Sequence, residues 1–514
     1  MSRHFAMRVQ SPQAGPVAGA DPGTGDGGEG GLREGLAGRV VSGPGLWLEE
    51  LEGLDREGLL ERLLGDGTVS GAVAAAPHGH KLDRVLTAKN TLLAVIAGCL
   101  FAGQGSGLVL RTVFAMPGLD RPAPGTPVPT GPALSKGRMR SGEHVARKAF
   151  ELDAARTDEE LGIGQVWHDM EVTAFDGTTA ELDGNPELAA AFGVPAGGKH
   201  PMLRIVALVR TATHRWAAAA AGGYHDGENA LADLLESALA AGMINLADRG
   251  FFSMDRFLRF SATGAQLCWR LKNGAKSVPC KTVKTLPDGS ELVMLRESDG
   301  MRGRRRRDSG DKAAPRLPDT LARLVQFTIV TRTRGGRAKT STIRLLTTLL
   351  DHERYPAREI AILYAERWQI EIAFLHLKKT LRGARRVLRG KSEVLVRQEA
   401  WAFLLVHNMI AAVAARAAAL AGIDPDLIPF TAVLSLARAG IHADTPCGHC
   451  GKLPADPLGQ LIDAITGLPR HRPGRKRTSG RTAAERRARP TEEVTYTITI
   501  TPSNLPQWQQ TPLS

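Results

Sequence analysis

The spacing of hydrophobic residues along the chain changes near residue 162. Between residues 45 and 150, leucine and alanine recur at helical intervals, which predicts helices over 82–110 and 135–150. Short apolar runs typical of strands follow at 166–175, 203–209, 216–223 and 243–247, with a helical segment at 228–241. More strand-like runs lie at 266–271, 327–332 and 341–349, and long helices are predicted at 356–381 and 392–421. This order predicts a mixed α/β sheet with helices on both faces.

Composition divides the chain further. Residues 1–45 are rich in Gly, Pro, Ala and Asp and have little to bury, so we predict a disordered segment. A helical N-terminal domain is predicted at 46–150 and an α/β domain at 151–425, with a polar insertion near 274–340. Residues 426–514 are interpreted as a helical region followed by a basic disordered tail.

The charge of the chain suits a polyanionic partner. Its 66 basic and 53 acidic residues give a net charge of +13. Residues 470–490 hold nine Arg or Lys and one Glu, so 9 − 1 = 8 of these charges lie in one segment, which we interpret as an arm that clamps DNA electrostatically. A second basic run, Arg302 and Arg304 to Arg307, is either a DNA-tracking loop or a solvated one.

Cysteine content and hydropathy predict a soluble cytoplasmic protein. Five cysteines do not form a disulfide framework. Cys447 and Cys450 supply too few ligands for a structural zinc, so a loop thiol pair is the favoured interpretation. The longest apolar run, 91–102, is shorter than the roughly 20 residues that span a bilayer, and the N-terminus has no signal-peptide pattern. We therefore expect no membrane association.

The predicted helix 356–381 carries four polar residues on one arc. At 100° per residue, Tyr364, Arg367, Glu371 and Lys378 fall within about 60° of each other. This arc borders an apolar stripe that faces the core, which places Glu371 at the edge of the core. The alternative is a solvent-exposed helix with charge pairs such as Arg367–Glu371.

Two aspartates have a comparable setting at predicted strand ends. Asp176 follows the run 166–175 and Asp248 follows the run 243–247. Together with Glu371, they could bind two divalent cations about 3.5–4 Å apart for an in-line phosphoryl displacement. Such hard oxygen ligands favour Mg²⁺, with Mn²⁺ as a substitute. For each aspartate alone, a turn or capping role is the alternative.

The spacing Tyr364-x2-Arg367-x3-Glu371-x6-Lys378 reproduces the Tyr-Arg-Glu-Lys signature of bacterial insertion-sequence DDE transposases. The segments Asp176-Gly-Thr and Ala-Asp248-Arg-Gly-Phe also resemble those that carry the first and second catalytic acids of that family. The resemblance covers roughly residues 135–415 and implies an RNase H-like core with a β-rich insertion, preceded by a helical domain that recognises DNA ends.

This resemblance implies that Asp176, Asp248 and Glu371 are both the catalytic residues and the ligands of two Mg²⁺ ions. By the same likeness Tyr364, Arg367 and Lys378 bind DNA phosphates near the cleaved end. That role suits the paired hydrogen bonds of Arg and the mobile charge of Lys.

Arg249, next to Asp248, and Trp269 complete the expected DNA contacts. Some relatives seal flanking DNA through a hairpin and stack a flipped base on a Trp of the insertion. Residues 274–340 contain no Trp or Tyr, so Trp269 is the candidate for that contact, with a position in the core of a strand as the alternative. Whether hairpins form stays open.

The sequence thus predicts a cut-and-paste transposase that cleaves double-stranded DNA at the terminal inverted repeats of an element. The freed 3′ hydroxyl would attack target DNA, and a homodimer would hold both ends. The alternatives are a nuclease of RNase H-like fold without strand transfer, a DNA-binding regulator derived from a transposase, and an inactive copy.

Overall fold

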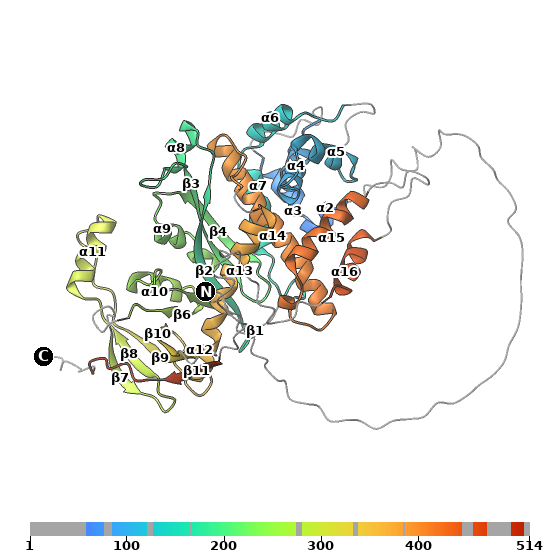
Figure 1. Cartoon of the computed structure of the whole chain (residues 1–514). Helices are drawn as coiled ribbons and strands as arrows, with labels where there is room; N and C mark the ends of the chain where they lie inside the picture. The colour runs from blue at the N-terminus through green and yellow to red at the C-terminus, as the bar shows by residue number, and fades with distance from the viewer. Residues whose placement is uncertain are drawn as a thin grey trace, which may run out of the picture. The chain divides into compact units, whose positions relative to one another are not determined.

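The computed structural model describes residues 58–76, 85–120, 127–163, 166–273, 280–332, 338–383, 386–444, 456–469 and 495–507 (Figure 1). These described residues belong to one compact unit. The predictions for residues 1–45, for Cys447 and Cys450 and for the basic segment 470–490 lie outside the described residues.

Five strands form the central sheet, in the order β4-β3-β2-β5-β6. Three of them are antiparallel: β2 (Met170–Glu181), β3 (Met202–Arg210) and β4 (Trp216–Gly223). The next two, β5 (Met243–Ala247) and β6 (Gln266–Arg270), run parallel to β2. This arrangement is the RNase H-like sheet that the sequence predicts. A short strand, β1 (Val166–Trp167), pairs with the start of β2.

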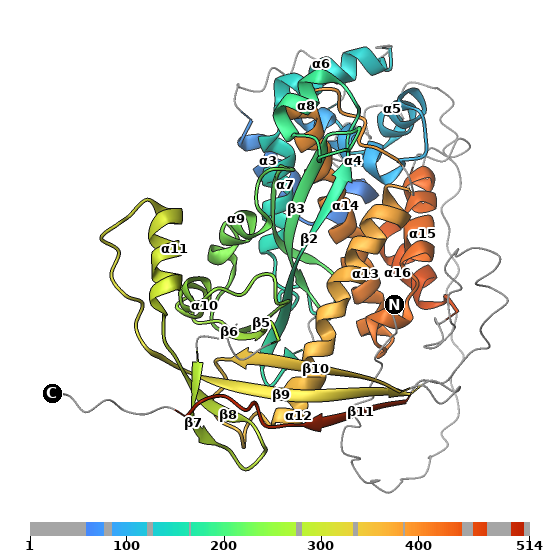
Figure 2. The same cartoon turned by 60° about the vertical axis from the view of Figure 1, so that its left-hand side comes forward.

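A second set of strands extends this sheet beyond β6. Strand β10 (Ala338–Thr347) pairs with β6, and β9 (Thr320–Arg332), β8 (Glu291–Leu295) and β7 (Cys280–Thr285) follow in turn (Figure 2). Strand β11 (Thr495–Ile500) pairs with β9 on the same edge as β8, along the part of β9 that β8 does not cover. The β-rich insertion is thus continuous with the central sheet. The arginine-rich run within it is a helix, α11 (Asp299–Ser309), and the prediction of a loop there is wrong.

Helices cover both faces of the central sheet (Figure 2). On one face α9 (Glu228–Asp233) and α10 (Met254–Ser261) pack on the side chains of Phe175, Val206 and Leu208. The 3-10 turn η1 (Glu236–Ala238) follows α9, so the helix predicted at 228–241 ends early. Short helices outside this layer are α8 (Pro186–Phe192) and η5 (Pro425–Leu427).

The opposite face is covered by one helical stretch that changes its winding. It consists of α12 (Ala357–Leu363), the 3-10 turn η3 (Tyr364–Trp368), α13 (Gln369–Leu375) and the π-helix η4 (His376–Leu381). Its extent confirms the helix predicted at 356–381. The apolar stripe is also confirmed, because Leu363, Ile370 and Phe374 are buried in the core.

The remaining helices form a layer around α14 (Glu393–Leu420). They are α2 (Leu59–Leu64), α3 (Thr68–Ala74), α4 (Ala88–Leu100), α5 (Ser106–Ala115), α6 (Gly131–Ser141), α7 (His144–Ala155), α15 (Phe430–Ala443) and α16 (Pro457–Thr466). The helix predicted at 135–150 is divided at Gly142, whose φ of 67° ends α6. Helices from both ends of the chain share one hydrophobic cluster. The predicted domain boundaries at 45, 150 and 425 stay predictions.

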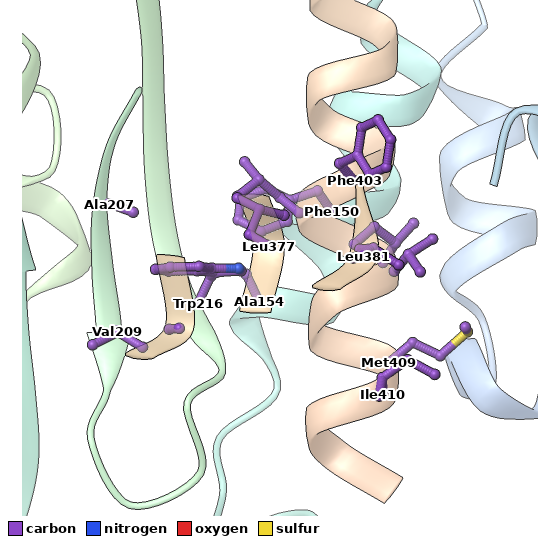
Figure 3. Packing of buried hydrophobic residues seen from close by; sticks show 14 of the residues in the cluster. Phe150, Ala154, Ala207, Val209, Trp216, Leu377, Leu381, Phe403, Met409 and Ile410 are labelled. Carbon is purple, nitrogen blue, oxygen red and sulfur yellow. The ribbon is translucent and has the colours of Figure 1, made fainter. Parts of the chain in front are cut away.

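Helix α14 is the centre of this layer. It is long and apolar enough to cross a membrane, yet 78% of its most apolar window is buried inside the fold, as in the core helix of a globular protein. Figure 3 shows how Phe403, Met409 and Ile410 of α14 lie in the same core as Trp216 of β4 and Leu377 of η4. This packing fixes the helical stretch 357–381 against the sheet.

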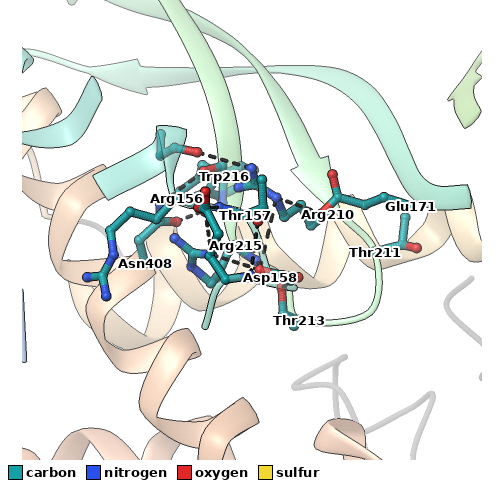
Figure 4. A network of polar contacts seen from close by, with 12 residues as sticks. Arg156, Thr157, Asp158, Glu171, Arg210, Thr211, Thr213, Arg215, Trp216 and Asn408 are labelled. Atoms are coloured by element: carbon teal, nitrogen blue, oxygen red, sulfur yellow. Dashed lines mark hydrogen bonds and ion pairs between the residues drawn. The ribbon is translucent and has the colours of Figure 1, made fainter. Parts of the chain in front are cut away.

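A buried polar network joins α14 and α7 to the beginning of β4 (Figure 4). The side-chain amide of Asn408 accepts a hydrogen bond from the backbone N–H of Trp216 at 2.7 Å and donates one to its carbonyl at 2.9 Å. The same amide donates to Asp153 at 2.8 Å, and Arg215 contacts Asp158 at 2.7 Å. Since buried polar groups are costly unless bonded, this network specifies how the helical layer meets the sheet.

Candidate active site

Asp176 lies on strand β2 and Asp248 directly follows the neighbouring strand β5, at corresponding positions in the sequence register. Strands β2 and β5 pair in parallel with Ala174 opposite Leu246, a separation of 246 − 174 = 72 residues. Asp176 and Asp248 have the same separation, 248 − 176 = 72, so they continue this register. Parallel strands lie about 4.8 Å apart, so this register would bring the two aspartates side by side, and the effect of the Asp248 charge on the pKa of Asp176 agrees with such proximity.

Only one of the two aspartates ends its strand. Asp248 directly follows β5, as predicted. Asp176 lies inside β2, which continues to Glu181, so the prediction that it terminates a strand is wrong. The cause is β3, which pairs with β2 from Thr173 to Glu181 and holds Asp176 opposite Ala207. The pairing between β2 and β5, however, ends at Ala174 and Leu246. The backbone of Asp176 is therefore paired with β3 on one side but not with β5 on the other.

Glu371 reaches the aspartates from α13 through a shared arginine. The guanidinium of Arg367 lies 3.6 Å from a carboxylate oxygen of Asp176 and 3.3 Å from one of Glu371. Arg367 itself is buried, with 7% of its surface exposed. One buried cation therefore connects the acid on the sheet with the acid on the helix.

Burial sets the electrostatics of these carboxylates. It raises the pKa of Asp176, against the lowering effects of the Gly177 N–H and of Arg367. The charge of Asp248 raises the pKa of Asp176 further. Burial likewise raises the pKa of Glu371, Arg367 lowers it, and the charge of Asp176 raises it again. Both acids thus have raised pKa values mainly because they are partly buried, and perturbed pKa values of this kind are typical of functional sites.

The other residues of the Tyr-Arg-Glu-Lys spacing lie around this centre. Tyr364 is buried, and its hydroxyl donates a hydrogen bond of 3.3 Å to the carbonyl of Ala247. Lys378 donates one of 2.9 Å to the hydroxyl of Thr178. Arg249 is exposed beside Asp248. Of the predicted DNA contacts, therefore, Arg249 is open to solvent, Lys378 is partly so, and Tyr364 contacts the fold itself.

Trp269 lies in the core of the sheet rather than at its surface. It is fully buried, its indole N–H donates to Asn245 at 2.9 Å, and its ring contacts Phe175, Phe257 and Phe260. This is the core position that the sequence left as the alternative. A DNA contact at Trp269 is not compatible with this burial, so we do not retain it.

Two charged residues at the site were not predicted. Arg270, at the end of β6, lies 3.5 Å from Asp248. Glu228, the first residue of α9, is close enough to Asp176 and Asp248 for both charges to raise its pKa, after the larger effect of burial and against the lowering effect of Arg204. The helical pattern at 228–241 gave no reason to single out its first residue.

The donor set fits a divalent cation in its chemistry. Carboxylate oxygens are the ligands that Mg²⁺ and Mn²⁺ prefer. The Oδ1 atom of Asp248 is buried and accepts no hydrogen bond from the described residues, and its contact with Arg270 is an ion pair at 3.5 Å. As they stand, however, no three Asp, Glu, His or Cys side chains in the described ranges are gathered tightly enough to hold a metal. Arg367 supplies the counter-charge between Asp176 and Glu371 in this state.

Comparison with known proteins points to one family. Residues 167–409 match the family described as "Transposase DDE domain". The chain is 29% identical over 310 residues to the transposase InsG for insertion sequence element IS4 of Escherichia coli (strain K12). That match covers 57% of this chain and 63% of the relative. A putative transposase InsZ of the same strain is 26% identical over 144 residues, 27% of this chain and 48% of the relative.

Among solved structures, the cryo-EM structure of a piggyBac transposase synaptic complex with hairpin DNA aligns with 81% of this chain and 86% of that chain. The identity is 9% and the TM-score 0.39, a likeness too small to bear on the fold. The chain spans less than two thirds of the length of the two curated relatives described above.

Proposed function

We propose that the chain is a DNA transposase, because residues 167–409 match the Transposase DDE domain family and the chain is similar to an insertion-sequence transposase. It would cleave double-stranded DNA at the ends of an insertion element and join the freed 3′ ends to target DNA. The observation that carries this proposal is that Arg367 contacts both Asp176 and Glu371, which lie 371 − 176 = 195 residues apart in the chain, while Asp248 follows the strand next to that of Asp176.

Asp176, Asp248 and Glu371 would hold the divalent cations, Mg²⁺ or Mn²⁺. When bound, such ions activate the attacking oxygen and stabilise the leaving 3′ oxygen. The sheet holds the two aspartates at one level, and α13 sets the height of Glu371 through its packing on the core. Arg367 balances the negative charge of Asp176 and Glu371, which keeps both acids in place near the reacting phosphate.

Lys378 and Arg249 are the residues of the site best placed to meet DNA phosphates. Both supply positive charge beside the acids, and neither is fully buried. We assign Tyr364 a positioning role, because its hydroxyl holds the helical stretch on the residue that precedes Asp248. A working homodimer that brings two element ends together, acting in the cytoplasm at the nucleoid, belongs to the same proposal.

The proposal is tested on DNA duplexes that carry the terminal inverted repeats flanking the gene. Uncut duplexes report cleavage in Mg²⁺, and pre-cut duplexes report joining to a plasmid. We expect Asp176→Asn, Asp248→Asn and Glu371→Gln each to lower both activities by more than about 100-fold. The matched control is Glu359→Gln, an exposed acid of α12 that pairs with His168.

The outcomes separate the alternatives. Cleavage without joining of pre-cut ends would identify a nuclease and overturn the transposase proposal. DNA binding with neither reaction in the wild-type protein would identify a regulator or an inactive copy. Full activity of Glu371→Gln would show that this site is not the catalytic one.

A further inference from the structure

The carboxylate of Glu228 approaches β2 at Gly177, the residue after Asp176. Side chains alternate along a strand, so Gly177 faces the side of β2 that Phe175 faces, where α9 packs. A Cβ atom built on Gly177 would lie 1.9 Å from Oε1 of Glu228. Any side chain larger than hydrogen at position 177 would therefore exclude this carboxylate. The glycine after Asp176 is what lets Glu228 approach the strand.

The position of Glu228 complements that of Glu371. Glu371 approaches Asp176 from the helical stretch on one face of the sheet, and Glu228 approaches from α9 on the other. The ladder between β2 and β5 ends before the level of Asp176, so β-pairing does not close the sheet between the two faces there. Asp176 therefore lies between two glutamates that come from opposite sides.

Arg204 is the positive charge that acts on Glu228, but it forms no ion pair with this carboxylate among the described residues. No hydrogen bond or ion pair to its carboxylate is found among the described residues, whereas Arg367 serves both Asp176 and Glu371. Burial and then the charge of Asp176 raise the pKa of Glu228, Arg204 lowers it, and the charge of Asp248 raises it again. The close approach to Gly177 therefore holds this carboxylate beside two like charges, an arrangement that a bound cation would stabilise.

We propose that Glu228 is a fourth carboxylate of the metal site, which contributes to the binding of a divalent cation shared with Asp176 and Asp248. This proposal rests on the proposed function, since it assigns a ligand to the same site. A solely structural role, as an acid favoured in the first turn of α9 by the helix dipole, is the alternative.

The test is calorimetric binding of Mn²⁺ to the full chain without DNA. We expect Glu228→Gln to weaken Mn²⁺ binding roughly 10-fold, the size typical of lost supporting ligands in metal sites. The control Glu187→Gln removes an exposed acid from the first turn of α8, another short helix, and should leave binding unchanged. In EDTA, Glu228→Gln should unfold at the same or a higher temperature than wild type, because it removes a repelled charge.

A second variant keeps Glu228 but displaces its carboxylate from β2. Gly177→Ala introduces the Cβ that collides with Oε1 of Glu228, so it should also weaken Mn²⁺ binding while the thermal unfolding remains cooperative. Unchanged Mn²⁺ affinity in Glu228→Gln, together with lost affinity in Asp176→Asn, would overturn the role of Glu228 and leave the proposed function standing. Unchanged affinity in Asp176→Asn as well would overturn both.

Discussion

Lys378 donates a hydrogen bond of 2.9 Å to the hydroxyl of Thr178, two residues beyond Asp176 on β2. The contact joins residues that are 200 positions apart in the chain and brings a positive charge to the acidic centre. Burial lowers the pKa of Lys378, and the neighbouring positive charges of Arg382 and Lys379 lower it further. Positive charge gathered in this way favours the binding of a phosphate group.

A phosphate role for Lys378 can be separated from its bond to Thr178. We predict that Lys378→Met weakens binding of element-end DNA and lowers the slope of log affinity against log salt by about 1, the value for one lost phosphate contact. Thr178→Val breaks the hydrogen bond but keeps the charge, so it should leave that slope unchanged. Filter binding between low and moderate salt measures both. An unaltered slope in Lys378→Met would contradict the assignment.

Tyr364 offers a test of positioning against DNA contact. Since its buried hydroxyl donates to Ala247, Tyr364→Phe should lower the free energy of unfolding by about 1 kcal/mol. DNA affinity should change little. Tyr355→Phe is the control, because the hydroxyl of Tyr355 makes no hydrogen bond with the described residues. Urea unfolding and DNA binding are both measured; weaker DNA binding at unchanged stability would instead indicate a phosphate contact.

The acids at the site should make stability depend on pH in a definable direction. Burial raises the pKa of Asp176 and Glu371 above the ordinary values of 3.8 and 4.5. The folded protein therefore holds extra protons in the window above these values, and the contribution of each acid to stability falls as pH rises through that window.

A difference measurement isolates this effect. In EDTA, the free energy of unfolding of Glu371→Gln relative to wild type should increase with pH from about 4.5 upward and then level off. Stabilisation by Mg²⁺ should show the opposite trend in the wild-type protein, because the metal binds the ionised carboxylates. A pH-independent difference between variant and wild type would show that Glu371 is not perturbed by burial.

Trp269 should matter for stability and not for DNA binding. Trp269→Phe leaves Oδ1 of the buried Asn245 without this donor, which costs about 1–3 kcal/mol. Trp368→Phe, at a tryptophan with 45% of its surface exposed, should shift stability by no more than about 0.5 kcal/mol. If Trp269→Phe were folded but had lost DNA affinity, that result would support the predicted DNA contact of Trp269 in spite of its burial.

Local patterns predicted the parts of the site that local interactions build. The bounds of β4 and β5 match the predicted runs 216–223 and 243–247, so Asp248 was found at its strand end. The wheel of residues 356–381 placed Glu371 beside the buried stripe, where it lies. These features depend on side chains within a few positions of each other, and sequence periodicity reports them directly.

Features built from distant contacts were not visible in the sequence. The length of β2 beyond Asp176 depends on pairing with β3, whereas in the sequence the pair Asp176-Gly177 is typical of a turn at the end of a strand. Glu228 enters the site only because α9 folds back over Gly177. Helix α11 forms from a run of arginines that the composition predicted to be a loop. Glu297, which precedes the helix, partly offsets their charge through its ion pair with Arg305.

The pairing of β11 with β9 has a consequence during synthesis of the protein. One edge of β9 is covered by β8 near its start and by β11 from Phe327 to Arg332. Strand β11 leaves the ribosome 495 − 332 = 163 residues after β9 ends. At roughly 5–20 residues per second, that edge stays open for about 8–30 s on the nascent chain. An unpaired strand edge is a template for association with other chains. The yield of folded protein should therefore depend on how quickly translation delivers the last strand.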